Sequence, residues 1–138
     1  MEDLNLFVNN NLLMIVMWFV LLFMLVNSFI KAAWDKTPQQ VVQIMNGGNS
    51  LILDVRENKE FETGHIADSV HIPMSEVKNR LSELDKYKDS QVVVSCRSGQ
   101  RSSRTCSLLK KNGFSNISNL KGGIVAWESD KLPVTTKS

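Results

Sequence analysis

The chain has 138 residues, of which 43% are hydrophobic and 22% charged, a length that allows one domain with a real core. After residue 30 it carries 16 basic and 12 acidic side chains, an excess of four that is far from the clustered basic surface of a nucleic-acid-binding protein, so nucleic acid is excluded as a partner. Its two cysteines exclude a disulfide-rich scaffold, and no CxxC pair or His/Cys cluster has the spacing of a zinc site, so no metal is expected.

The first predicted element is a membrane-spanning helix. Residues 12–26 are fifteen in a row without a polar side chain, and the longer stretch 12–34 supplies the roughly 20 mostly apolar residues that a span requires. A cleavable signal peptide fits less well, because Glu2 and Asp3 stand where its basic residues would lie. A buried core helix is disfavoured, because no polar face interrupts the run. We therefore interpret residues 1–36 as a membrane anchor.

Two lysines predict the orientation of this anchor. Lys31 and Lys36 follow the apolar run, whereas the charged residues before it are acidic. The positive-inside rule then places the rest of the chain in the cytoplasm, so we expect a single-pass membrane protein with a cytoplasmic domain. In that compartment both cysteines stay reduced.

The soluble part is predicted to alternate between helices and strands. A helix begins at Thr37, which is the N-cap, with Pro38 at the first helical position and Gln40 completing a capping box. Further helices are predicted at 75–84 and 102–111, and strands at 51–55, 91–95 and 116–118. This alternation predicts an α/β fold with a parallel sheet, followed by a frayed tail at 135–138.

The segment SCRSGQRSS, residues 95–103, lies between a predicted buried strand and a predicted helix. Open α/β sheets bind ligands beyond the carboxyl ends of their strands, where loop N–H groups and a helix start form an anion-binding cradle. Cys96 is the first residue of this cradle, so its nucleophilic thiolate form should be favoured. On local sequence alone, the segment could also be a solvated connection with an incidental cysteine.

Other residues of the segment suit an anion-binding loop. Gly99 permits backbone conformations that a side chain would obstruct, and Ser98 and Ser102 offer hydroxyls at the helix entrance. Arg97 and Arg101 could hold an oxyanion substrate and would lower the pKa of the thiol further.

Three segments, in order, resemble the signatures of rhodanese-like domains, the single-domain sulfurtransferases. LILDVRENKEFETGHIADSVHIP is similar to the amino-terminal signature, CRSGQRS to the active-site loop, and LKGGIVAW followed by LPV to the carboxyl-terminal signature. The resemblance covers residues 37–134. It implies an α/β rhodanese-like domain whose central parallel sheet, of about five strands, is flanked by helices.

The resemblance also implies an activity. In this family the cysteine matching Cys96 accepts a sulfane sulfur from a small anionic donor such as thiosulfate, or from a persulfide, and passes it to a thiol or protein acceptor. The intermediate is a persulfide on the cysteine, and no separate cofactor takes part. Donor and persulfide would be held by the loop residues Arg97, Ser98, Gly99, Gln100, Arg101 and Ser102.

Two alternative functions remain open. Relatives on this fold that act on phosphate or arsenate resemble Cys-x5-Arg phosphatases, but Arg101 is five positions after Cys96, which gives the shorter Cys-x4-Arg. The short loop favours sulfur over the chemistry of a phosphatase or arsenate reductase. The second alternative is a noncatalytic adaptor that recruits a partner to the membrane, against which the retained cysteine and arginines argue.

Most remaining motif residues are expected to be structural. Asp54 and Arg56 match family residues that organise structure near the active loop, and we expect an ion pair or hydrogen bonds from them. His65 is expected to fix a turn by hydrogen bonding, not to act as a base. Gly122 and Gly123 should shape a turn.

Separate predictions concern three further positions, Cys106, Asp68 and Lys131. Cys106 is expected to be a core residue, because ten residues of helix would separate it from Cys96 by about 15 Å, beyond the roughly 7 Å limit of a disulfide. Asp68 and Lys131 stand where the family commonly has glycine. Asp tolerates a left-handed backbone better than most residues. Neither position touches the cysteine loop, so these departures bear on local turns more than on the activity.

Overall fold

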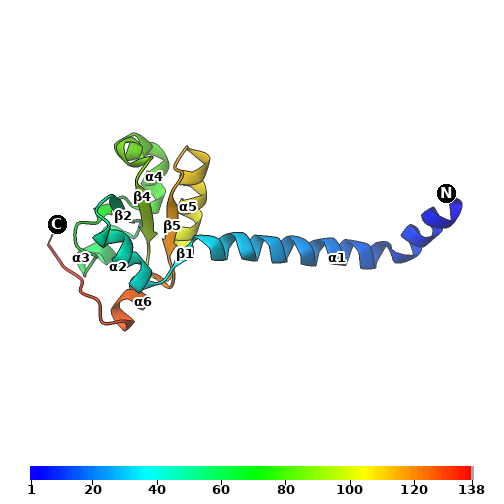
Figure 1. Cartoon of the computed structure of the whole chain (residues 1–138), viewed down its shortest axis with the longest axis horizontal. Coiled ribbons are helices and arrows are strands. Elements are labelled where there is room, and N and C mark those ends of the chain that lie inside the picture. The colour runs from blue at the N-terminus through cyan, green and yellow to red at the C-terminus, as the bar shows by residue number, and fades with distance from the viewer. Residues whose placement is uncertain (138) are drawn as a thin grey trace. The chain divides into compact units, whose positions relative to one another are not determined.

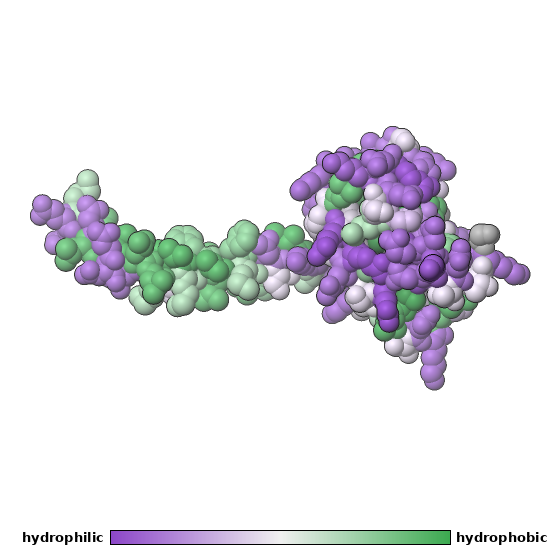
Figure 2. All heavy atoms as spheres, turned by 180° about the vertical axis from the view of Figure 1, so that it is seen from behind, coloured by the Kyte–Doolittle hydropathy of each residue, from purple (hydrophilic) through white to green (hydrophobic). Residues whose placement is uncertain are grey.

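The computed structural model describes residues 1–137 and divides into two compact units, residues 1–33 and the chain from Trp34 onward. The first unit is formed by the helix α1 (Glu2–Trp34), whose last residue belongs to the second unit, and none of the side chains of α1 is buried. Apolar side chains cover most of its length (Figure 2), and it has the length and composition that a membrane span requires. It starts well before the predicted 12–34 span, because no glycine or proline interrupts the preceding residues.

The second unit is built on a five-stranded sheet in the order β1-β5-β4-β2-β3, in which every neighbouring pair is parallel (Figure 1). The strands are β1 (Asp35–Lys36), β2 (Ser50–Asp54), β3 (Val70–His71), β4 (Gln91–Ser95) and β5 (Ile117–Leu120). The predicted parallel sheet is confirmed, with the three predicted strands at its centre. The edge strand β1, which follows α1 directly, was not predicted.

Helices flank the sheet. They are α2 (Pro38–Asn46), α3 (Asn58–Glu62), α4 (Met74–Val77), the 3-10 helix η1 (Lys78–Tyr87), α5 (Gln100–Lys111) and α6 (Gly123–Ser129). The predicted capping box of α2 is confirmed. The Gln40 N–H donates to the Thr37 hydroxyl at 3.3 Å, and the Thr37 N–H donates to Gln40 Oε1 at 2.9 Å.

The segment between β3 and β4 differs from the single helix predicted at 75–84. The α-helical turn of α4 continues as η1, in which Arg80 leaves the helical region with φ −114° and ψ 18°. Leu81 and Leu84 both pack in the core, and they are three residues apart. A 3-10 helix aligns residues at that spacing on one face, so the tighter helix satisfies the same apolar pattern.

Two apolar layers enclose the sheet, because alternate residues of a strand point to opposite faces. The layer beneath α4, η1 and α5 contains Leu51, Leu53, Leu84, Val92, Val94, Cys106 and Leu109. The layer beneath α2 and α6 contains Val41, Ile52, Val93, Ile124 and Trp127. Cys106 is fully buried, which confirms it as a core residue, and burial raises the pKa of its thiol to about 12.

Both departures from family glycines adopt a left-handed backbone. Asp68 has φ 60° and Lys131 has φ 57°, the conformation in which glycine is usually found. The turns are therefore retained without the glycines, at the cost of a less favourable backbone conformation at each residue.

The carboxyl-terminal segment differs from the frayed tail predicted at 135–138. Thr135 pairs with His65 in an antiparallel bridge, in which each N–H donates to the other residue's carbonyl, at 2.8 and 2.9 Å. This pairing joins positions 70 residues apart, which a local pattern does not show. Ser138, the last residue of the predicted tail, lies outside the described residues.

Candidate active site

The candidate nucleophile Cys96 follows β4 directly and starts the loop that leads into α5. Gly99 is the N-cap of α5 and has φ 97°, so the loop folds back over the cysteine. The Gly99 N–H donates a hydrogen bond to the Cys96 sulfur at 3.0 Å, and the Ser102 hydroxyl oxygen lies 3.2 Å from the same atom. Cys96 is only 1% exposed, so these groups take the place of water around the sulfur.

Two opposing effects set the acidity of Cys96. Burial raises the pKa of the thiol, because the charged thiolate loses its hydration. Hydrogen bonds from the Ser102 hydroxyl and from the N–H groups of Ser102, Gly99 and Ser98 stabilise the thiolate, and together they lower the pKa below its ordinary value. The loop is therefore an anion-binding cradle centred on the sulfur.

The turn before α6 supports the loop from the other side. The Ile124 N–H donates to the Cys96 carbonyl at 2.8 Å, and the Val125 N–H donates to the Arg97 carbonyl at 3.2 Å. A Cβ atom on Gly123 would overlap both of these carbonyl oxygens, and φ of 61° also favours glycine there. The structure thus gives Gly123 the turn-shaping role expected of it, directly against the candidate active loop.

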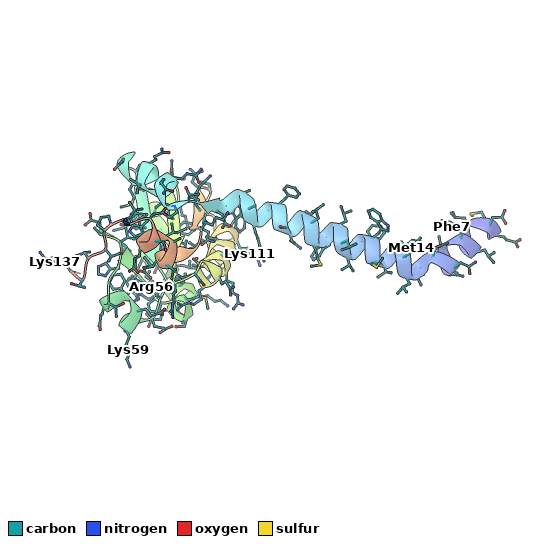
Figure 3. The ribbon with its side chains drawn as sticks, turned by 90° about the horizontal axis from the view of Figure 1, so that it is seen from below. Phe7, Met14, Arg56, Lys59, Lys111 and Lys137 are labelled. Carbon is teal, nitrogen blue, oxygen red and sulfur yellow. The ribbon has the colours of Figure 1, made fainter. Side chains whose placement is uncertain are left out.

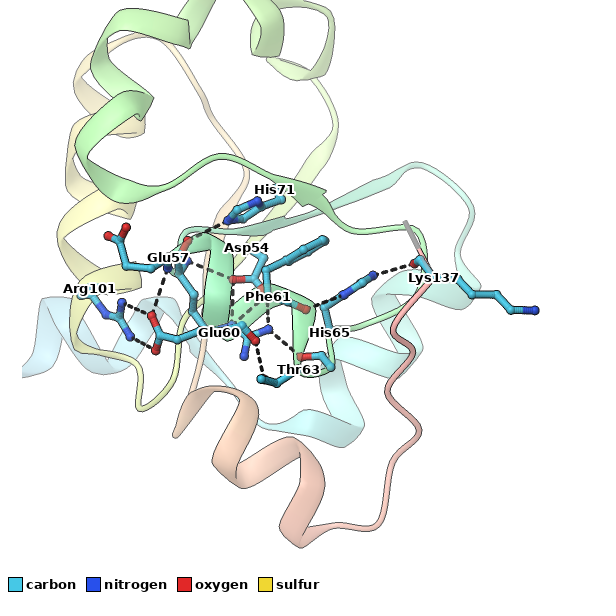
Figure 4. Close-up of polar contacts among 11 residues, drawn as sticks. Asp54, Glu57, Glu60, Phe61, Thr63, His65, His71, Arg101 and Lys137 are labelled. Carbon is cyan, nitrogen blue, oxygen red and sulfur yellow. Dashed lines mark hydrogen bonds and ion pairs between the residues drawn. The ribbon is translucent and has the colours of Figure 1, made fainter.

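Arg101 is held by an acid from a distant part of the chain. Its Nη1 and Nη2 atoms donate to the two carboxylate oxygens of Glu60 on α3, at 2.8 and 2.7 Å (Figure 4). The Arg101 guanidinium lowers the pKa of Glu60 to about 2. Local sequence patterns could not identify Glu60, because it lies 41 residues before its partner.

A cavity of about 450 Å³ lies beside the loop. Arg97 and Val125 line it, and α3 contributes Lys59 and Glu60. Figure 3 shows Lys59 extending away from the domain, whereas Arg56 lies within it. The cavity therefore combines cationic, acidic and apolar groups beside the loop.

Asp54 and Arg56 form a buried ion pair at the end of β2. Arg56 Nη2 lies 2.7 Å from Asp54 Oδ2 and also donates to the Gly64 carbonyl at 2.8 Å. Asp54 is in register with Ser95, the residue before Cys96. The pair therefore joins the end of β2 to the Gly64 carbonyl beside the end of β4, and its structural role stays a prediction.

An aromatic stack continues this scaffold. The Phe61 ring lies between the rings of His65 and His71, with centroids 3.7 and 4.3 Å away. The two ring nitrogens of His65 lie 2.9 and 2.8 Å from the carbonyl oxygens of Phe61 and Lys137, and His71 Nε2 lies 2.7 Å from the Arg56 carbonyl (Figure 4). His65 thus contacts both its own turn and the carboxyl-terminal segment, and its structural role stays a prediction.

A sequence profile of the rhodanese-like domain matches residues 37–130, more than half of the chain. The chain belongs to the rhodanese-like domain family. It is 30% identical over 139 residues to the uncharacterized protein YibN of Escherichia coli (strain K12), with 97% of each chain covered. It is 40% identical over 84 residues to a sulfurtransferase of Allochromatium vinosum, which covers 61% of this chain and 77% of that protein.

The fold is shared with solved structures as well. A rhodanese-related protein from Thermoplasma volcanium superposes with a TM-score of 0.68 and 30% identity, covering 75% of this chain and 98% of that one. The predicted rhodanese-like fold, with a parallel sheet flanked by helices and an apolar helix ahead of it, is therefore confirmed.

Within this rhodanese-like domain, the structure separates the predicted loop residues into three groups, one of which is Arg101, paired with Glu60. Gly99 and Ser102 contact the Cys96 sulfur, whereas Arg97, Ser98 and Gln100 have exposed side chains. Substrate binding by the loop and the absence of a cofactor stay predictions. Within residues 1–137, no group of three or more His, Cys, Asp or Glu residues is placed to hold a metal ion.

Proposed function

We propose that this protein is a sulfurtransferase that carries sulfane sulfur as a persulfide on Cys96. The observation that carries the proposal is the buried Cys96 sulfur, which receives the Gly99 N–H at 3.0 Å and has the Ser102 hydroxyl at 3.2 Å. Donors aimed at a buried sulfur stabilise negative charge there, and both a thiolate and a persulfide are anions. Similarity to the Allochromatium vinosum sulfurtransferase supports the same class of reaction.

The proposed reaction has two steps, and each conserves charge and sulfur. The Cys96 thiolate first attacks the sulfane sulfur of thiosulfate, so that a new S–S bond forms while the bond to the sulfite sulfur breaks and sulfite leaves with the electron pair. An acceptor thiolate then attacks the outer sulfur of the Cys96 persulfide, and Cys96 leaves as a thiolate. A persulfide donor reacts in the same way, with its own thiolate as the leaving group.

The two loop arginines have different parts in this proposal. Arg97 is exposed and lines the cavity beside the loop, so it is the cation that meets an anionic donor. Arg101 uses both Nη atoms on Glu60, so it contributes positive potential near the sulfur from a fixed position. The donor site therefore depends on Arg97 more than on Arg101.

We also propose that α1 anchors the domain to a membrane, on its cytoplasmic side. Similarity to YibN covers 97% of both chains and so includes most of α1, and Lys31 and Lys36 follow the apolar run. The chain should stay in the membrane pellet after an alkaline carbonate wash. Protease should digest the domain in inside-out vesicles and spare it in right-side-out vesicles, and the reverse pattern would contradict the orientation.

Intact-mass spectrometry of the full-length protein in detergent tests the sulfurtransferase proposal. Thiosulfate should add one sulfur atom to the wild type and to Cys106→Ser, but none to Cys96→Ser. Cys106→Ser is the matched control, because it changes the other buried cysteine. Cyanide or a thiol acceptor should then remove the added sulfur.

Three results would contradict the sulfurtransferase proposal or establish a different function. A wild-type mass that thiosulfate leaves unchanged, with no transfer to cyanide or thiol, overturns the proposal. Hydrolysis of an aryl phosphate that depends on Cys96 would establish a phosphatase on this fold. A cellular phenotype that survives Cys96→Ser and is lost with residues 1–30 would establish an adaptor.

A further inference from the structure

The Ser102 hydroxyl lies between two groups that can accept its hydrogen. Its oxygen is 3.2 Å from the Cys96 sulfur and 2.5 Å from Asn119 Oδ1, on β5. All three residues are buried, with at most 4% of each exposed, so water does not supply an alternative partner. A hydroxyl has a single hydrogen, so Ser102 donates to the sulfur or to Asn119 but not to both at once.

The orientation of the Asn119 amide is fixed by two acceptors on its other side. Asn119 Nδ2 donates to Asp35 Oδ1 at 2.9 Å and to the Gly99 carbonyl at 3.2 Å. Asp35 on β1 and Asn119 on β5 are in register, which holds the carboxylate opposite the amide. Turning the amide over would set its oxygen against two further oxygens, so Oδ1 stays directed at Ser102.

We propose that Asn119 is a positioning residue for the Cys96 nucleophile, because its amide oxygen holds the Ser102 hydrogen while the sulfur is protonated and yields it when the sulfur ionises. In the thiol state the Cys96 S–H donates to the Ser102 oxygen, and Ser102 donates to Asn119. When the thiol proton leaves to solvent, the Ser102 O–H rotates from Asn119 Oδ1 to the sulfur, so the Ser102–Asn119 hydrogen bond is replaced by one to the thiolate. The two hydrogen bonds donated by Asn119 Nδ2 stay as they are. Asn119 Oδ1 thus competes with the Cys96 thiolate for the hydrogen of Ser102, which stabilises the thiolate when it is donated to the sulfur.

The charged groups around the hydrogen bonds of Cys96, Ser102 and Asn119 are the same when Asn119 is replaced. Arg101 acts on Cys96 from α5 and is paired with Glu60 from α3. The Asp35 carboxylate on β1 accepts from Asn119, and the Cys106 thiol lies in the same layer as Cys96. Asn119 itself is neutral, so its substitution adds or removes no charge, and Asp35 loses one hydrogen-bond donor. The proposal rests on the proposed function only in taking Cys96 as the nucleophile.

Titration of the thiolate in the full-length protein tests the proposal without any sulfur donor. The pKa of Cys96 is measured from the ultraviolet absorbance of the thiolate, as the difference between each variant and the same variant carrying Cys96→Ser. Asn119→Ala should lower this pKa by about 0.5–1 pH unit, the contribution of one hydrogen bond of ordinary strength, because Ser102 is then free to donate to the sulfur. Ser102→Ala should raise it.

The double variant separates this competition from a general change in the site. In the Ser102→Ala background, Asn119→Ala should leave the pKa of Cys96 unchanged, because the shared hydrogen is already gone. A pKa that is raised or unchanged by Asn119→Ala alone, or a shift that persists without Ser102, overturns the proposal. If circular dichroism shows that the alanine variant is unfolded, Asn119→Ser decides by the same criteria, since its short hydroxyl leaves Ser102 free. If thiosulfate failed to load sulfur onto Cys96, which would contradict the proposed function, these titrations would still measure the pKa of Cys96.

Discussion

Cys96 and Cys106 lie in the same apolar layer, but their thiols have opposite acid–base behaviour. They are 1% and 0% exposed, so burial raises the pKa of both. At Cys106, whose sulfur contacts the Ser118 carbonyl at 3.6 Å, the pKa rises to about 12. At Cys96, hydrogen bonds from groups of Ser102 and Gly99 outweigh burial and lower the pKa.

The difference follows from the position of each cysteine relative to α5. Cys106 is inside this helix, where backbone N–H groups are used by the helix itself. Cys96 lies just ahead of the helix, where the first N–H groups have no partner within it and can turn to the sulfur. The two thiols are equally buried, so the difference in their acidity comes from the N–H and O–H groups available to each sulfur.

The largest expected effect is a difference in alkylation between the two cysteines. With a pKa below the ordinary value at Cys96 and about 12 at Cys106, the reactive thiolate fractions near neutral pH differ by about a thousandfold or more. Iodoacetamide should label Cys96 in the folded protein and Cys106 only after denaturation. Peptide mass spectrometry measures both rates, and similar rates in the folded protein would show that the comparison is wrong.

The second effect tests the support of the loop around Cys96. Gly123→Ala should lower the rate of sulfur loading by about 100-fold, because its Cβ would displace the carbonyls of Cys96 and Arg97 and misplace the sulfur. Gly48→Ala is the matched control: Gly48 also has positive φ, 87°, but a Cβ there meets no atom within 4 Å. It should lose about 1–2 kcal/mol of stability and keep its loading rate. Equal loss of rate in both variants would contradict the role of the close approach.

Local patterns predicted the parts of the site that depend on neighbours in sequence. The strand, Cys96, Gly99 and the helix that follows appear in that order within a few residues, so the cradle was predictable from the segment itself. The capping box that begins with Thr37 was predictable for the same reason.

Contacts between distant segments were not predictable in this way. The Glu60–Arg101 pair spans 41 residues and the Asp35–Asn119 hydrogen bond spans 84. The Asp35–Asn119 hydrogen bond arises because β1 lies beside β5, and no local sequence pattern predicts the order of strands in a sheet. Glu60 and Asn119, which contact the loop from distant segments, were therefore missed, although the loop was found.

A smaller effect should appear in the pH dependence of stability. The pKa of Cys106 is raised to about 12 in the folded chain, against roughly 8.5 when unfolded, so its contribution is complete below about pH 8.5 and is lost as the pH rises toward 12. Between pH 7 and 10 the wild type should lose about 2 kcal/mol more stability than Cys106→Ala. Urea unfolding at both pH values measures this, and Cys96 cancels because both proteins contain it. Parallel losses would mean that the buried thiol does not resist ionisation.

The smallest effect concerns the charge beside Cys96, where the Glu60–Arg101 pair is about one-third exposed. The pKa of the Glu60 carboxyl is about 2 in the folded chain, against about 4.3 when unfolded. The contribution of Glu60 to stability is therefore complete above about pH 4.3 and is lost as the pH falls toward 2. Solvent screening limits this contribution to about 0.5–1 kcal/mol. Glu60→Gln should therefore be less stable than the wild type by that amount at pH 7, and the gap should narrow toward pH 3 in urea unfolding. A gap that stays constant would show that the Arg101 side chain does not depend on the Glu60 charge, and the positive potential near Cys96 would then be fixed by other contacts of the loop.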